Sequence, residues 1–148
     1  MGRFFSLVQI KNNGSREQFL KAFCDVMKKR SLVPCSEKES SVSYILAFSE
    51  SGKWVTLASK EYRDNPKQVK DDAKQTAAEM KTSSFSMDVV DSDWTYIELH
   101  TGADVHDTVM VGRSEFDEEH SPKGRRECWE PILAPGKTWE QLSEKWNK

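Results

Sequence analysis

The three histidines of this chain, His100, His106 and His120, are of a type that binds metal ions, and Glu98 is a possible carboxylate ligand beside His100. His100 and His106 flank the segment TGAD. A five-residue loop between two strands places both on one sheet face near Glu98, whereas a four-residue loop places them on opposite faces. The sequence lacks the HExxH and CxxC spacings that are specific for zinc, so we expect no metal ligand and no cofactor.

The three cysteines could act as nucleophiles, but the sequence places no histidine next to any of them. Cys35 and Cys128 fall in predicted loops and are the exposed candidates for a nucleophile. A nucleophilic cysteine needs a neighbouring base or a cationic field, and the arginines before Cys128 are offset by adjacent glutamates. Cys24 lies on the apolar stripe of a predicted helix and is expected to be buried. The sequence has no GxGxxG, GxxxxGK[ST] or GxSxG motif, so an enzyme would need an active site scattered along the chain. We place this hypothesis third, after the two binding functions described below.

Helix starts are marked by capping sequences. Ser15 with Gln18, and Thr138 with Gln141, have the spacing of capping boxes, in which two side chains satisfy free backbone N–H groups. Pro66 suits the first position of another helix. We therefore predict helices over residues 16–30, 66–82 and 138–147.

Six segments are rich in β-branched and aromatic residues and are bounded by turn residues, which predicts strands. The chain order is strand, helix, hairpin, helix, hairpin and one further strand. This order predicts an α+β fold, a mostly antiparallel sheet covered by two helices in a ferredoxin-like or doubled helix-plus-hairpin arrangement, with a short C-terminal helix. The predicted strands are residues 4–10, 42–49, 54–59, 84–90, 94–100 and 105–112.

Alternation along the two hairpins predicts a sheet that is apolar on both faces. One parity carries aliphatic residues and suits a helix-covered core: Ile45, Ala47, Val55 and Leu57, with Thr95, Ile97 and Leu99. The other parity carries aromatic residues with a few polar ones: Tyr44, Phe48, Trp54, Trp94 and Tyr96, with Thr56, Glu98 and His100. A second apolar face has to be shielded from water.

The chain end supplies a candidate shield. Trp139, Leu142 and Trp146 recur at i, i+3 and i+7 on one side of the last helix. A helix of some ten residues is unstable alone in water and persists only where its apolar side docks. We expect this tail to shield part of the aromatic face and to leave a groove beside it. The alternative is that the tail reaches a partner or a second copy of the chain.

Composition limits the partners. A chain of 148 residues suits one domain, and 22 basic against 24 acidic residues give no long-range attraction for nucleic acid. No apolar stretch has the length of a membrane span, and the N-terminal segment, in which Gly2 and Ser6 match an acylation pattern, is interpreted as a strand. An odd number of cysteines without CxxC spacing favours reduced thiols and a cytoplasmic protein.

We predict three parts: an α+β core over residues 1–112, a charged loop over 113–128 and a Trp-rich C-terminal tail over 129–148. The expected function is a non-catalytic binding or accessory module that holds a small molecule or a peptide. The alternative is a protein-interaction or antagonist module that acts through the charged loop and the tail. The expected ligand-binding residues are Tyr44, Trp54, Trp94, Tyr96, Glu98 and His100.

Overall fold

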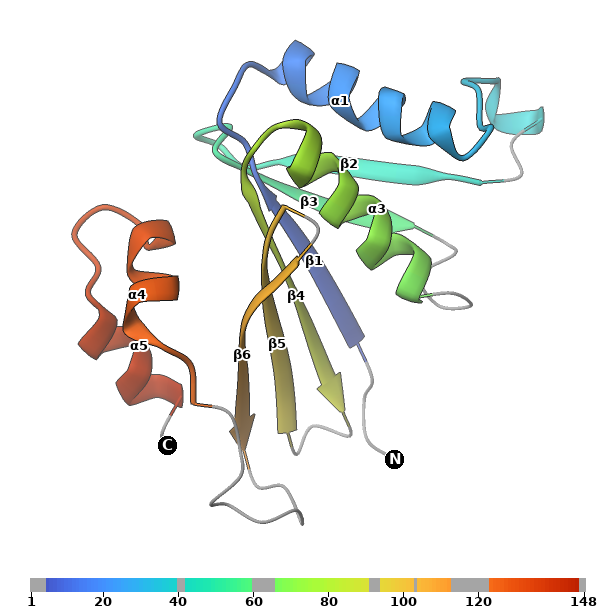
Figure 1. Cartoon of the computed structure of the whole chain (residues 1–148). Coiled ribbons are helices and arrows are strands. Elements are labelled where there is room, and N and C mark those ends of the chain that lie inside the picture. Colours follow the sequence, from blue (N-terminus) through green and yellow to red (C-terminus); the bar gives the residue numbers. More distant parts are fainter. Residues whose placement is uncertain are drawn as a thin grey trace.

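A computed structural model describes residues 5–39, 42–59, 66–90, 94–102, 104–112 and 123–146. These residues form one six-stranded antiparallel sheet and the helices α1, α3, α4 and α5, so the predicted α+β class is confirmed (Figure 1). Within the described residues, the helices are too short and too polar for any of them to cross a membrane.

The sheet is built around the N-terminal strand. Its order is β2-β3-β1-β4-β5-β6, and each neighbouring pair is antiparallel. The six predicted strands are confirmed, with ends that differ by two residues at most. Their bounds are β1 Phe5–Lys11, β2 Tyr44–Phe48, β3 Trp54–Ser59, β4 Ser83–Val90, β5 Trp94–Thr101 and β6 Asp104–Gly112.

The predicted capping boxes are confirmed. Ser15 Oγ accepts a hydrogen bond from the Gln18 amide at 3.1 Å, and Gln18 Oε1 accepts one from the Ser15 amide at 2.7 Å. Thr138 and Gln141 form the same pair of bonds at 3.2 and 3.1 Å. The helices are α1 Arg16–Lys29, α3 Pro66–Glu79, α4 Arg126–Trp129 and α5 Trp139–Trp146, and short 3-10 turns cover Glu37–Glu39 and Glu130–Ile132.

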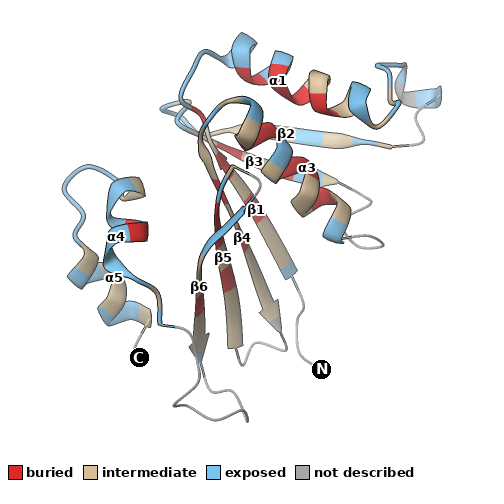
Figure 2. Ribbon diagram, viewed as in Figure 1, coloured by how far each residue is buried: buried red, intermediate tan, exposed pale blue. Residues whose placement is uncertain are grey.

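The main core lies between the sheet and the two long helices. α3 packs on β1, β3, β4 and β5, and α1 packs against α3. We call this side of the sheet the helix face. Small residues on α3 let it approach the strands closely. The buried residues of this core are Val8, Ile10, Val55 and Leu57 of the sheet, Phe19 and Phe23 of α1, and Val69, Ala73 and Ala77 of α3 (Figure 2).

The opposite side of the sheet carries the C-terminal segment, residues 123–146. This segment includes the end of the predicted charged loop and most of the predicted tail, and from here on we call all of it the tail. Trp129 is 4% exposed, and its ring meets that of Trp146 edge to face, with centroids 5.1 Å apart. We call this side of the sheet the tail face. The tail side chains Ile132, Trp139, Leu142 and Trp146 pack with Trp129 against Ile97, Leu99 and Val109.

The tail therefore packs on the aliphatic residues of β5, whereas the prediction put it on the face that carries Trp94 and Tyr96. The register of the first hairpin also corrects a prediction. Ile45 pairs with Ala58 and Ala47 with Thr56, so these side chains share the tail face with Trp54 and not the core with Val55. Ile45 is 66% exposed as a result.

Candidate functional site

The six predicted ligand-binding residues do not form one surface. Trp94, Tyr96, Glu98 and His100 alternate along β5 on the helix face, since Glu98 pairs with Ser86 and Ser86 with Val8. Tyr44 shares that face but lies on β2, four strand spacings or roughly 19 Å away. Trp54 lies on the tail face, so the predicted common face is wrong for this residue.

Glu98 and His100 belong to a buried polar cluster instead. Their cross-strand partners are Ser86 and Ser84, and Oε1 of Glu98 lies 3.6 Å from Nε2 of His100. His100 is 1% exposed and the serines are buried as well. Nε2 of His100 and the two serine hydroxyls have no hydrogen-bond partner among the described residues. Burial closes the His100 ring to a substrate, whereas the Glu98 side chain is 21% exposed.

The buried imidazole predicts a pH dependence of stability. Burial lowers the pKa of His100, and Lys74 and Lys70 of α3 add to this effect, while Glu98 opposes it. The unfolded chain then binds a proton more readily than the folded one. The contribution of His100 is therefore complete above about pH 7 and declines as the pH falls below about 6.5. We expect the free energy of unfolding, measured with urea between about pH 7.5 and about pH 5.5, to fall more steeply in the wild type than in His100→Gln. Parallel pH profiles would contradict this expectation.

His100 and His106 do not meet at a common site. Leu99 pairs with Asp107 and His100 with Val105, so His106 is the extra residue of a bulge, and it is exposed. His120 lies outside the described residues. Over the ranges that the structure describes, no group of three His, Cys, Asp or Glu side chains has an arrangement that could hold a metal ion.

The cysteines occupy three different environments. Cys35 is exposed, as predicted, whereas Cys24 is only half-buried. Cys128 was expected in an exposed loop, but it is 4% exposed because α4 places it against the sheet with Trp129. Burial raises the pKa of the Cys128 thiol. This thiol is a packing group and not a nucleophile.

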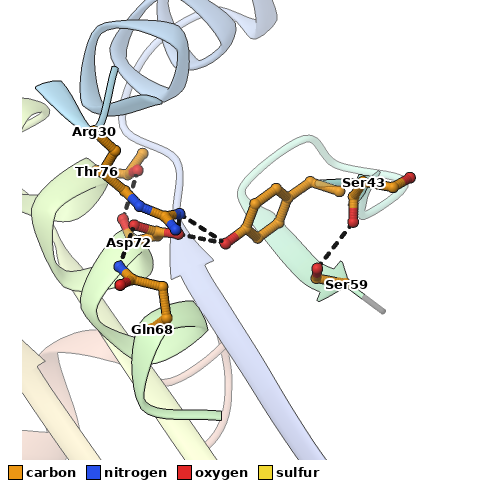
Figure 3. Close-up of polar contacts among 7 residues, drawn as sticks. Arg30, Ser43, Ser59, Gln68, Asp72 and Thr76 are labelled. Atoms are coloured by element: carbon orange, nitrogen blue, oxygen red, sulfur yellow. Dashed lines mark hydrogen bonds and ion pairs between the residues drawn. The ribbon is translucent and has the colours of Figure 1, made fainter. Parts of the chain in front are cut away.

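A second polar cluster ties α1, α3 and β2 together (Figure 3). Arg30 Nη1 donates to Oδ2 of Asp72 at 2.6 Å, and Gln68 Nε2 donates to Oδ1 of Asp72 at 3.1 Å. The Tyr44 hydroxyl also donates to the Asp72 carboxylate, and Thr76 Oγ1 donates to its backbone carbonyl at 2.8 Å. Asp72 is 2% exposed, and its burial raises the pKa of the carboxyl group against the opposing effects of Tyr44 and Arg30. The cluster is structural and fixes the orientation of Tyr44.

Hydrogen bonds hold the tail at the β6 edge. Trp129 Nε1 donates to Oδ2 of Asp107 at 2.7 Å, and the backbone N–H of Arg125 donates to the same oxygen at 2.7 Å. Burial works to raise the pKa of Asp107, but these hydrogen bonds outweigh it and the pKa lies below its usual value. On the tail face, helix α5 packs on β6. The tail thus covers β5 and β6 on the tail face, and its apolar cluster extends to Phe85 and Met87 of β4.

The rest of the tail face carries a groove of about 480 Å³ beside Trp54. Trp54 meets Phe85 of β4 edge to face, with ring centroids 5.5 Å apart. Gln9 Nε2 donates to Thr56 Oγ1 at 2.8 Å on the floor between them. We call this site the Trp54 groove; its lining residues are Gln9, Ala47, Phe48, Ser49, Trp54, Thr56 and Phe85, and none of them is charged.

Phe85 and Gln9 were missed in the sequence. The alternation of SSFSMDVV could have identified Phe85, because it places Phe85 and Met87 on one face of their strand. In the structure these two residues pair with Leu99 and Ile97. Apolar surface continues past the groove, since Phe5 and Ile45 on the same face are 53% and 66% exposed.

In comparisons with known proteins, the chain matches no family model, no curated protein and no solved structure.

Proposed function

We propose that this protein is a non-catalytic binding module whose Trp54 groove holds an apolar peptide segment of a partner protein. One observation carries the proposal: the tail packs over β5 and β6 on an apolar sheet face, and the rest of that face bears an aromatic groove. Exposed apolar surface of this kind is typical of interaction sites. The Trp54 and Phe85 rings supply contact area, and the Gln9–Thr56 pair supplies polar groups that orient a peptide.

We also propose that the strands and helices around the groove form a known type of fold unit. β1, α1, β2, β3, α3 and β4 make a ferredoxin-like unit, in which α1 and α3 cover the helix face. The strand order β2-β3-β1-β4 and the antiparallel pairing of its neighbours support this. In such a unit each helix joins two strands that lie on either side of a third.

The alternative functions have less support. An interaction through the charged loop and the tail has to compete with the packing of Trp129 and Trp146 on the chain's own sheet. Residues 113–122 of that loop lie outside the described residues. An enzyme that uses Glu98 and His100 would need access to a histidine that is 1% exposed.

Selection from a displayed peptide library on the immobilised protein tests the proposal. Selected peptides are expected to bind Trp54→Ser at least about ten-fold more weakly than the wild type, since central tryptophans dominate interface energies. Trp94→Ser is the matched control, because Trp94 lies on the helix face. Failure to select any peptide, or equal affinity for the wild type and Trp54→Ser when both melt alike, would refute the proposal.

A further inference from the structure

A pocket of about 660 Å³ lies at the end of α1, on the helix face of β2, whereas Trp54 of the groove lies on the tail face. Its walls come from the C-terminal half of α1, the segment after that helix and the start of β2. This volume is within the range of small-molecule sites. The apolar side chains that line it are Phe23, Met27, Leu32, Val33, Pro34, Val42 and Tyr44.

Backbone hydrogen bonds hold the wall that follows α1. The amide of Leu32 donates to the Met27 carbonyl at 3.0 Å, and that of Ser31 donates to the Lys28 carbonyl at 2.9 Å. Ser31 has a φ of 61°, which turns the chain back across the end of the helix. Leu32 is thereby directed into the pocket lining while Val33, at the rim, is 76% exposed.

Tyr44 forms the opposite wall, and its ring is fixed at both ends. The ring packs edge to face on Phe23, with centroids 5.3 Å apart, and the hydroxyl is held by Asp72. Burial, with the hydrogen bond to Asp72 and the charge of that residue, raises the pKa of Tyr44, so the phenol stays neutral. A preformed wall lowers the entropy lost when a ligand binds.

The charges at the pocket decide the class of ligand. Glu39 is the one acidic or basic residue in the lining, among the residues the structure describes. Lys28 and Lys38 adjoin the lining residues Met27 and Glu39 in the chain, but neither lysine is part of the lining. Arg30 adjoins Ser31, but its guanidinium is paired with Asp72 at 2.6 Å. An anionic head group would therefore meet an acid and would find no cation in the lining to pair with.

We propose that this pocket binds a neutral apolar small molecule, such as an alkyl or aryl compound with an uncharged polar group. Apolar side chains from three segments make up most of the lining, and the pocket presents no cation for an acid. The proposal does not depend on the function of the Trp54 groove.

Binding of the neutral dye N-phenyl-1-naphthylamine tests the proposal, and the fluorescence of the dye reports its binding. We expect 1-dodecanol to displace the dye at least about ten-fold more effectively than dodecanoate does, because burying an unpaired carboxylate is unfavourable. Leu32→Asp should weaken dye binding by a similar factor, whereas the matched change Leu20→Asp on the outer side of α1 should not. Dye binding that is absent in the wild type, or equal in the two variants, would overturn the proposal.

Thiol protection is a second measurement, and it does not need a variant. Cys24 and Cys35 line the pocket, whereas Cys128 is buried beside the tail. Bound dye should slow the alkylation of Cys24 and Cys35 by a maleimide and leave the rate at Cys128 unchanged. Unaltered rates at Cys24 and Cys35 under saturating dye would place the dye elsewhere and overturn the proposal. Dye binding that survives Trp54→Ser separates this site from the groove.

Discussion

Replacing Gly124 by alanine is expected to lower the free energy of unfolding by about 2–4 kcal/mol. Gly124 has a φ of +78°, a conformation that L-residues with a side chain rarely adopt. A Cβ there would lie 2.7 Å from Cγ2 of Val109 and 3.3 Å from both Nε1 of Trp129 and the Trp146 ring. The added methyl group would therefore push the tail away from β6. Urea unfolding monitored by tryptophan fluorescence measures the change.

Gly136 supplies the control for this experiment. Its φ is +79°, but a Cβ there would have no atom within 4 Å among the described residues. Gly136→Ala therefore isolates the backbone cost, about 1–2 kcal/mol. Equal losses in the two variants would mean that the tail does not press on Val109, and the packing described for the tail face would be wrong.

Replacing Asp72 by alanine is expected to cost about 3–5 kcal/mol, because it leaves the Arg30 guanidinium, the Tyr44 hydroxyl and the Gln68 amide without their shared acceptor in a buried site. In an Arg30→Met background the same change should cost less, since the half-buried Arg30 cation is then no longer left unpaired. Urea unfolding of the four proteins in this cycle gives the coupling between Arg30 and Asp72.

The exposed pair of Lys21 and Asp25 is the comparison. Its atoms lie 2.9 Å apart, but the Lys21 side chain is 78% exposed, so Asp25→Ala is expected to leave the unfolding midpoint unchanged. Midpoints that shift equally for Asp72→Ala and Asp25→Ala would show that the buried cluster does not anchor β2 to the helices.

The six strands and the helices α1, α3 and α5 were predictable because their signals are local, whereas α4 begins where a charged loop was predicted. Ser15 and Thr138 mark helix starts by hydrogen bonds within four residues, and the strands were bounded by turn residues. The six-residue site was not predictable, because it depended on register. Phe48 pairs with Val55 across an even number of residues, whereas Val90 pairs with Trp94 across an odd number. Loop composition does not determine that parity, and a shift of one residue moves Trp54 to the opposite face.

The idea that both sheet faces are apolar could be predicted, but which residues cover each face could not. Ile97 and Leu99 were expected under the long helices, yet they pack against the tail. On the helix face, Trp94 and Tyr96 do lie on β5 as expected, but the same face continues into the buried polar residues Ser84, Ser86 and His100. The small residues Ala73 and Ala77 indicate that α3 packs closely, but the alternation of a strand does not show which of its faces a helix covers.

The indole N–H signals of the five tryptophans, followed by nuclear magnetic resonance during titration with a selected peptide, test the proposed groove most directly. We expect the Trp54 signal to move with the bound fraction while those of Trp94 and Trp129 stay in place. Movement of Trp94 or Trp129 with a stationary Trp54 would contradict a peptide site on the part of the tail face that bears Trp54 and Phe85.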